Sequence, residues 1–137
     1  MNIFDIEKLP YVEFGSKITR KVRIVISPET TGETRLAIVQ VNIPPGGISD
    51  GHMHDKSDEY IYFDNDGAVI LDGIRHEVKR GSLVQAVKGV IHECINTSSE
   101  KELNLFCVFV PPFEPYGSYP ELIESTKNFL KDKITYL

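Results

Sequence analysis

Apolar and polar residues alternate along much of the chain, in short runs that turn residues separate. The first two runs, Lys21 to Ser27 and Arg35 to Ile43, flank the loop Pro28 to Gly32, which predicts a hairpin. Asp72-Gly73 marks a tight turn further along. Other runs of strand length lie at 52–54, 59–63, 68–71, 74–78, 82–87, 90–96 and 102–110. Many short strands at this spacing predict an all-β fold, as an antiparallel sandwich or barrel.

The end of the chain has a helical pattern instead. Ser118 or Tyr119 can cap a helix that has Pro120 at its first position, and this predicts a helix over about 119–134. Apolar side chains recur there at roughly helical spacing, at Leu122, Ile123, Phe129, Leu130 and Ile134. We therefore expect one helix face to dock either on the barrel or on a second subunit.

Length and composition indicate one globular domain over residues 1–137. The net charge is −5 and the basic residues are scattered, so the chain lacks the basic stripe of a nucleic-acid binder. The most apolar segment, Leu103 to Phe113, is about half the length that spans a membrane, which favours a buried strand. The acidic N-terminus does not resemble a secretory signal, so we expect a cytoplasmic protein with free thiols at Cys94 and Cys107.

Three of the four histidines fall into one pattern with an acidic residue. His52 and His54 are two positions apart, so a strand would place both imidazoles on one face. Glu59 follows across a short polar connection, and His92 comes from a distant strand. Three imidazoles and a carboxylate form a nitrogen and oxygen ligand set suited to one divalent transition metal, and Fe, Mn, Ni and Zn remain open. A six-coordinate ion held in this way keeps about two open positions.

These residues carry a resemblance to a known family. Gly46, His52-Met53-His54 and Glu59, at their spacing, resemble the first motif of the cupin superfamily. The second motif is matched by residues 81–96, through Gly81, Gly89, His92 and Asn96. The resemblance covers residues 46–96 and implies a double-sheet jelly-roll barrel with a C-terminal helix beside it. It also implies an internal metal held by His52, His54, Glu59 and His92.

The chain departs from the motifs at two positions. Val87 stands where a proline usually precedes the second motif's glycine, which weakens the turn signature but removes no ligand. The glycine that closes the first motif comes one position late, at Gly67, so the hairpin after Glu59 can be one residue longer. Asp58 is therefore a rival ligand, although Glu59 fits the spacing better and has the longer side chain.

Strand parity also predicts which neighbours of the ligands face inward. Ile61 and Phe63 share the face of Glu59 and should line an apolar wall, so Tyr60 and Tyr62 would point outward.

Cys94 and Asn96 share the parity of the second-motif histidine and could face the cavity, where Cys94 is expected to behave as a small apolar residue. His76 is expected to be partly exposed, without a chemical role. Arg75 and Lys79 could hold a substrate carboxylate, but a solvated face is the simpler interpretation.

The favoured function is a metal-dependent enzyme acting on a small polar metabolite such as a keto acid, an enol or a sugar derivative. An inward-facing tyrosine base is not expected, which favours an oxygen-dependent dioxygenase over an isomerase or lyase. A non-catalytic small-molecule-binding cupin is the other alternative, since fold does not fix reaction. We also expect a homodimer, with Ile3, Phe4, Ile6 and the C-terminal helix as candidate covers for exposed strand edges.

Overall fold

The structure is a computed structural model that describes residues 2–15, 17–112 and 120–131. Its strands are β1 (Val12–Phe14), β2 (Arg20–Ile26), β3 (Ala37–Ile43), β4 (Asp58–Phe63), β5 (Gly67–Leu71), β6 (Ile74–Val78), β7 (Leu83–Ala86), β8 (His92–Ile95) and β9 (Leu103–Val110). The helices are a 3-10 turn at Ile6–Lys8, α1 (Pro28–Thr31) and α2 (Pro120–Lys131).

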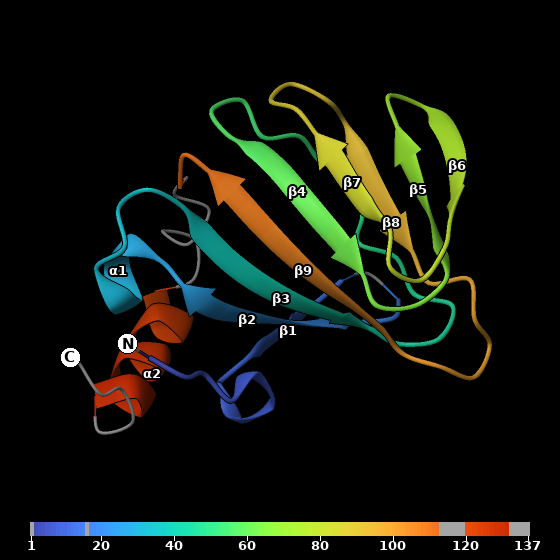
Figure 1. Ribbon diagram of the computed structural model, residues 1–137. Coiled ribbons are helices and arrows are strands. Elements are labelled where there is room, and N and C mark those ends of the chain that lie inside the picture. Colours follow the sequence, from blue (N-terminus) through green and yellow to red (C-terminus); the bar gives the residue numbers. More distant parts are fainter. Residues whose placement is uncertain (1, 16, 113–119, 132–137) are drawn as a thin grey trace.

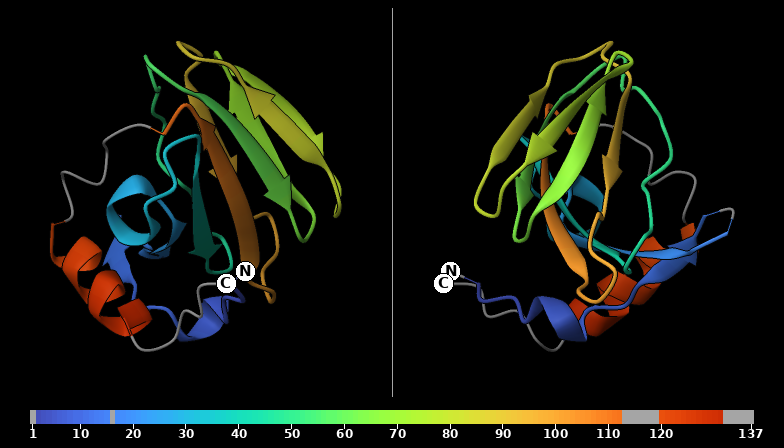
Figure 2. Two further views of the ribbon diagram at one scale, coloured as in Figure 1. Left: turned by 60° about the vertical axis from the view of Figure 1, so that its left-hand side comes forward. Right: turned by 90° about the vertical axis from the view of Figure 1, so that its right-hand side faces the viewer.

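The strands form two antiparallel sheets. One has the order β1-β2-β3-β9-β4-β7 and the other the order β6-β5-β8. Figures 1 and 2 show the smaller sheet lying over one end of the larger sheet, with α2 at the opposite end. The fold is all-β, as the alternation predicts, and it is the jelly-roll barrel that the motif resemblance implies.

The main core lies between the two sheets and follows from the alternation along the strands. In β9, every second side chain from Leu103 to Phe109 is buried, while the residues between them are only partly buried. The smaller sheet contributes Val69, Val78 and Cys94 to the same apolar cluster. Burial of this face stabilises the barrel and fixes which side chains of β4 and β9 point inward.

The C-terminal helix packs on its own chain. Leu122 joins the main core cluster, whereas Leu130 packs with Leu9 and Val25 in a second cluster. Phe4 and Ile6 are partly buried against that second cluster. Of the two docking alternatives for the helix, the structure therefore shows the one within the chain. The homodimer stays a prediction, and Ser118, Tyr119 and Ile134 lie outside the described residues.

Three local expectations were wrong. The segment Pro28 to Gly32 is more than a loop, because α1 forms there with the Oγ of Ser27 accepting a hydrogen bond from the Thr30 amide at 3.1 Å. Residues 52–54 do not form a strand, and only His52 makes an isolated bridge, to His92. The connection after β4 is not a hairpin, because β4 pairs with β7 and β9 while β5 pairs with β6 and β8.

Gly67, at the start of β5, lies too close to its neighbours for a side chain. A Cβ atom there would lie 2.7 Å from the carbonyl oxygen of Ile95 and 3.1 Å from the ring of Phe63. We expect Gly67→Ala to lower the free energy of unfolding by about 1–3 kcal/mol, because the backbone of β8 must shift. Urea titration of the metal-free protein measures this. Gly51→Ala is the control, since its Cβ would meet no atom closer than 3.5 Å.

None of the helices among the described residues is long and apolar enough to cross a membrane.

Candidate metal centre

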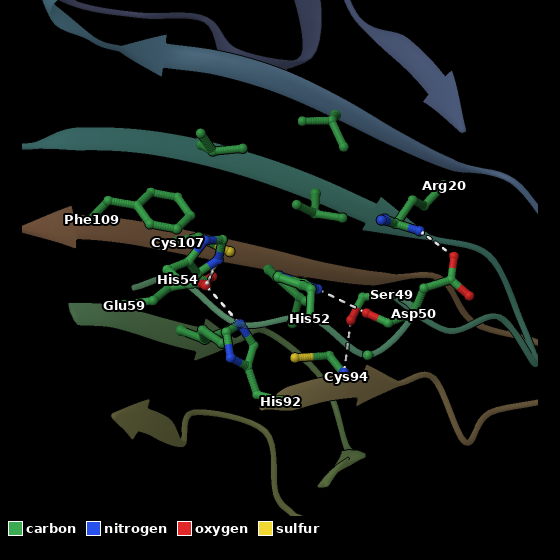
Figure 3. A pocket seen from close by; sticks show the side chains of 16 residues that line it. Arg20, Ser49, Asp50, His52, His54, Glu59, His92, Cys94, Cys107 and Phe109 are labelled. Carbon is green, nitrogen blue, oxygen red and sulfur yellow. Dashed lines mark hydrogen bonds and ion pairs between the residues drawn. The ribbon is translucent and has the colours of Figure 1, made fainter. Parts of the chain in front are cut away.

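The predicted ligand residues come together inside the barrel. His52 and His54 lie in the segment between β3 and β4, Glu59 is the second residue of β4, and His92 is the first residue of β8. One ligand atom from each of the four lies within 4.8 Å of the others. Figure 3 shows the side chains pointing toward one another from these separate segments.

The carboxylate of Glu59 is the centre of the cluster. Its Oε1 lies 2.9 Å from Nε2 of His92 and 3.0 Å from Nε2 of His54. Glu59 and His92 are 4% and 2% exposed. Burial by itself would raise the pKa of Glu59, but hydrogen bonds and attraction from His54 and His92 outweigh burial and lower this pKa to about 2. The carboxylate is therefore ionised at neutral pH, as a metal ligand must be.

Two of the histidine rings are oriented by backbone carbonyls. Nδ1–H of His52 donates to the Asp50 carbonyl at 2.8 Å, and Nδ1–H of His92 donates to the Val90 carbonyl at 3.1 Å. These hydrogen bonds leave the Nε2 atoms to face the cluster, which is the arrangement that holds metal-bound imidazoles in place. Burial also lowers the pKa of His52 and so favours its neutral, metal-binding form. The donor set therefore fits a first-row divalent ion.

The rival ligand Asp58 does not join the cluster. Its Oδ1 accepts a hydrogen bond from the Lys88 amide at 2.9 Å. The one-residue shift to Gly67 thus leaves Glu59 as the inward carboxylate, because β4 keeps an unbroken register with β9 from Asp58 to Phe63.

A cavity of about 300 Å³ adjoins the four side chains. Its walls are mainly apolar and come from both sheets and the 49–54 segment. The lining residues besides the four are Arg20, Val22, Val39, Val41, Ser49, Asp50, Gly51, Ile61, Cys94, Leu105, Cys107 and Phe109. The volume lies at the small end of the range for ligand sites, about 300–1,000 Å³.

The parity prediction for β4 is correct in its main point. Ile61 lines the cavity, while Phe63 is buried deeper in the core. The Tyr60 hydroxyl contacts Gln85 at 3.4 Å, and Tyr62 lies near the ring of Phe106, so neither lines the cavity.

Both cysteines line the cavity as protonated thiols. Burial raises the pKa of Cys94 and of Cys107, so neither is a thiolate at neutral pH. The expectation that Asn96 faces the cavity was wrong. Its amide instead donates to the carbonyls of Ile43 and Lys101, at 2.9 and 2.8 Å.

The surface residues considered earlier have no part in the site. His76 is exposed, and Arg75 pairs with Glu77 at 2.8 Å on the exposed face of β6. The basic residue that does line the cavity is Arg20, which sequence reasoning missed. It stands one position before the alternating run that begins at Lys21, and its parity with Val22 is the signal that places it inside.

Comparison with known families identifies the class of protein. Residues 39–109, just over half of the chain, match the family described as "Cupin domain". The chain therefore belongs to the cupin family. No curated protein matches the sequence significantly.

Solved structures of other proteins share the fold. A predicted oxalate decarboxylase from Thermotoga maritima superposes with a TM-score of 0.70 at 18% identity, over 80% of this chain and 98% of that chain. Ectoine synthase from P. lautus gives a TM-score of 0.68 at 15% identity, over 88% of this chain and 86% of that one. KdgF from Halomonas sp. gives a TM-score of 0.61 at 20% identity, over 77% and 88%.

Proposed function

We propose that this cupin is a metal-dependent enzyme that oxidises a small organic molecule with molecular oxygen, as a dioxygenase. The observation that carries the proposal is the cavity: four convergent ligand residues at one side, and walls that are mainly apolar. A bound divalent ion would supply Lewis acidity and, if it is iron, access to oxygen chemistry.

The chain's own residues limit the other chemistry available in the cavity. Glu59 is ionised, but it belongs to the ligand cluster and would be occupied by the metal. The two thiols are protonated. Asp50 is paired with Arg20 at 3.0 Å. An isomerase or lyase that moves a proton between carbons needs a positioned base, and neither tyrosine of β4 lines the cavity. The apolar side chains of β3 and β9 that line the cavity offer few polar groups to a reacting molecule.

The competing proposal is an isomerase or lyase of a sugar or keto acid. Its support is that proteins named as a predicted oxalate decarboxylase and an ectoine synthase share the fold. These likenesses give the fold, and the mainly apolar cavity of this chain supports the dioxygenase proposal over the competing one.

Oxygen dependence tests the proposal. The protein is loaded with Fe²⁺ without oxygen and given a panel of small 2-oxo acids, enediols and 2-hydroxy acids, with and without air. We expect turnover only in air, with one O₂ consumed per substrate molecule converted, since both oxygen atoms enter the product or products. Equal turnover without air would establish the isomerase or lyase. His76→Gln, on the exposed face of β6, is the control and should keep full turnover.

A further inference from the structure

Arg20 places a positive charge in the wall of a mainly apolar cavity. It is the first residue of β2, and its side chain is only 10% exposed. It lines the cavity with Val22, two positions further along the strand. Figure 3 shows Arg20 at one end of the cavity and Glu59, His54 and Phe109 at the other, with His52 and Cys94 between.

The ion pair between Arg20 and Asp50 joins a buried group to a half-exposed one. Nη1 of Arg20 lies 3.0 Å from Oδ2 of Asp50, whose side chain is 48% exposed. Such a half-exposed carboxylate is well solvated, and pairs of this kind contribute little to stability. The guanidinium, by contrast, is largely removed from water, so an anion inside the cavity would interact with it at a lower effective dielectric.

The charges around the cavity favour an anionic ligand. The half-exposed carboxylate of Asp50 is screened by solvent and offsets the buried guanidinium of Arg20 only in part, so Arg20 keeps a positive charge in the cavity with or without the metal. A 2+ ion with the single carboxylate of Glu59 would add about +1. Most of the side chains that line the cavity from the large sheet are apolar, among them Val22, Val39, Val41 and Leu105. A molecule that fits both features has an apolar body and one negatively charged end.

We propose that Arg20 binds a carboxylate of the substrate, so that the substrate is a small carboxylic acid with an apolar chain. Its carboxylate lies at Arg20 and its reacting end lies toward the histidine cluster. Arginine suits this role because its planar guanidinium can donate two parallel hydrogen bonds to a carboxylate. The orientation of the reacting end rests on the function proposed above, whereas the carboxylate site stands on Arg20 and the cavity alone.

Binding of two isosteric probes tests the site. Dissociation constants of pentanoate and pentanamide are measured by NMR titration with metal-free and with Zn²⁺-loaded protein. We expect pentanoate to bind roughly tenfold or more tightly than pentanamide in both forms, because hydrogen bonds to charged groups are the stronger ones. Arg20→Gln should remove this preference in both forms. Arg20→Lys, which keeps the charge but loses the planar fork, should retain part of it.

Arg23→Gln is the matched control. It removes the same charge from the same strand, but Arg23 contacts the Leu9 carbonyl and Gln40 away from the cavity, so the preference should persist. An unchanged preference in Arg20→Gln would overturn the proposal. So would a preference seen only with Zn²⁺, since the carboxylate would then bind the metal. Metal content and oxygen-dependent turnover are measured separately. A carboxylate preference without oxygen-dependent turnover would support the Arg20 site and contradict the proposed dioxygenase. Turnover without the preference would do the opposite.

Discussion

Replacing His52 and His54 together with alanine is expected to lower the divalent metal content from about one ion per chain to background. Both Nε2 atoms belong to the four-ligand cluster, and a site with two ligands left cannot hold an ion against water. Protein purified without chelator is compared by elemental analysis, and activity on any identified substrate should disappear with the metal. His76→Gln, which alters an exposed histidine, is the control and should keep its metal.

Metal removal should also show in the stability of the wild-type protein. An ion present at a hundredfold excess over its Kd adds about 2.7 kcal/mol to the free energy of unfolding. For a chain of this size that is a fall in Tm of roughly 5–10 °C on adding chelator. The double variant should show no such change. Equal metal content in the variant and the wild type would contradict the site.

Asn96→Ala is expected to lower the free energy of unfolding by about 3–5 kcal/mol, since each buried polar group that loses its partner costs about 1–3 kcal/mol. The Asn96 side chain is buried and joins three backbone groups. Nδ2 donates to the carbonyls of Ile43 and Lys101, and Oδ1 accepts from the Ser98 amide at 3.0 Å. One amide thus joins the end of β3 to the turn between β8 and β9.

Urea unfolding of metal-free protein measures this effect. Asn96→Asp should be nearly as damaging, because an ionised carboxylate has no donor for the two carbonyls. Gln85→Ala removes an exposed amide of β7 and should change stability by less than about 0.5 kcal/mol. A loss of under about 1 kcal/mol for Asn96→Ala would show that the turn holds its shape without the side chain.

Much of the fold could be predicted because alternation is strong where both sheets bury one face. β9 is the clearest case, with four inward side chains in register. The short elements carried weaker signals. β1 has only three residues, too few for a period to show, and α1 has four. The cap at Ser27 and the proline after it are helix signals, but over so short a segment they also fit a turn.

The convergence of the four candidate ligand residues could be predicted, although the reason given for part of it was wrong. His52 and His54 were expected to share a strand face, yet residues 52–54 form no strand. Their rings converge because the backbone of His52 pairs with that of His92 and the segment then leads into β4. Arg20 was missed because the cavity wall is formed by residues from several strands. Parity along a single strand does not show which residues lie opposite it across the barrel.

The cluster takes its members from both sheets, with Glu59 on the larger one and His92 on the smaller one. A bound ion would therefore link two layers that also meet through apolar contacts and through the hydrogen bond from Asn96 to the Ile43 carbonyl. It would link positions 59 and 92 in the folded chain alone, and its binding would stabilise the folded state for that reason. Binding of the ion would then stabilise the barrel and prepare the site for its ligand at the same time.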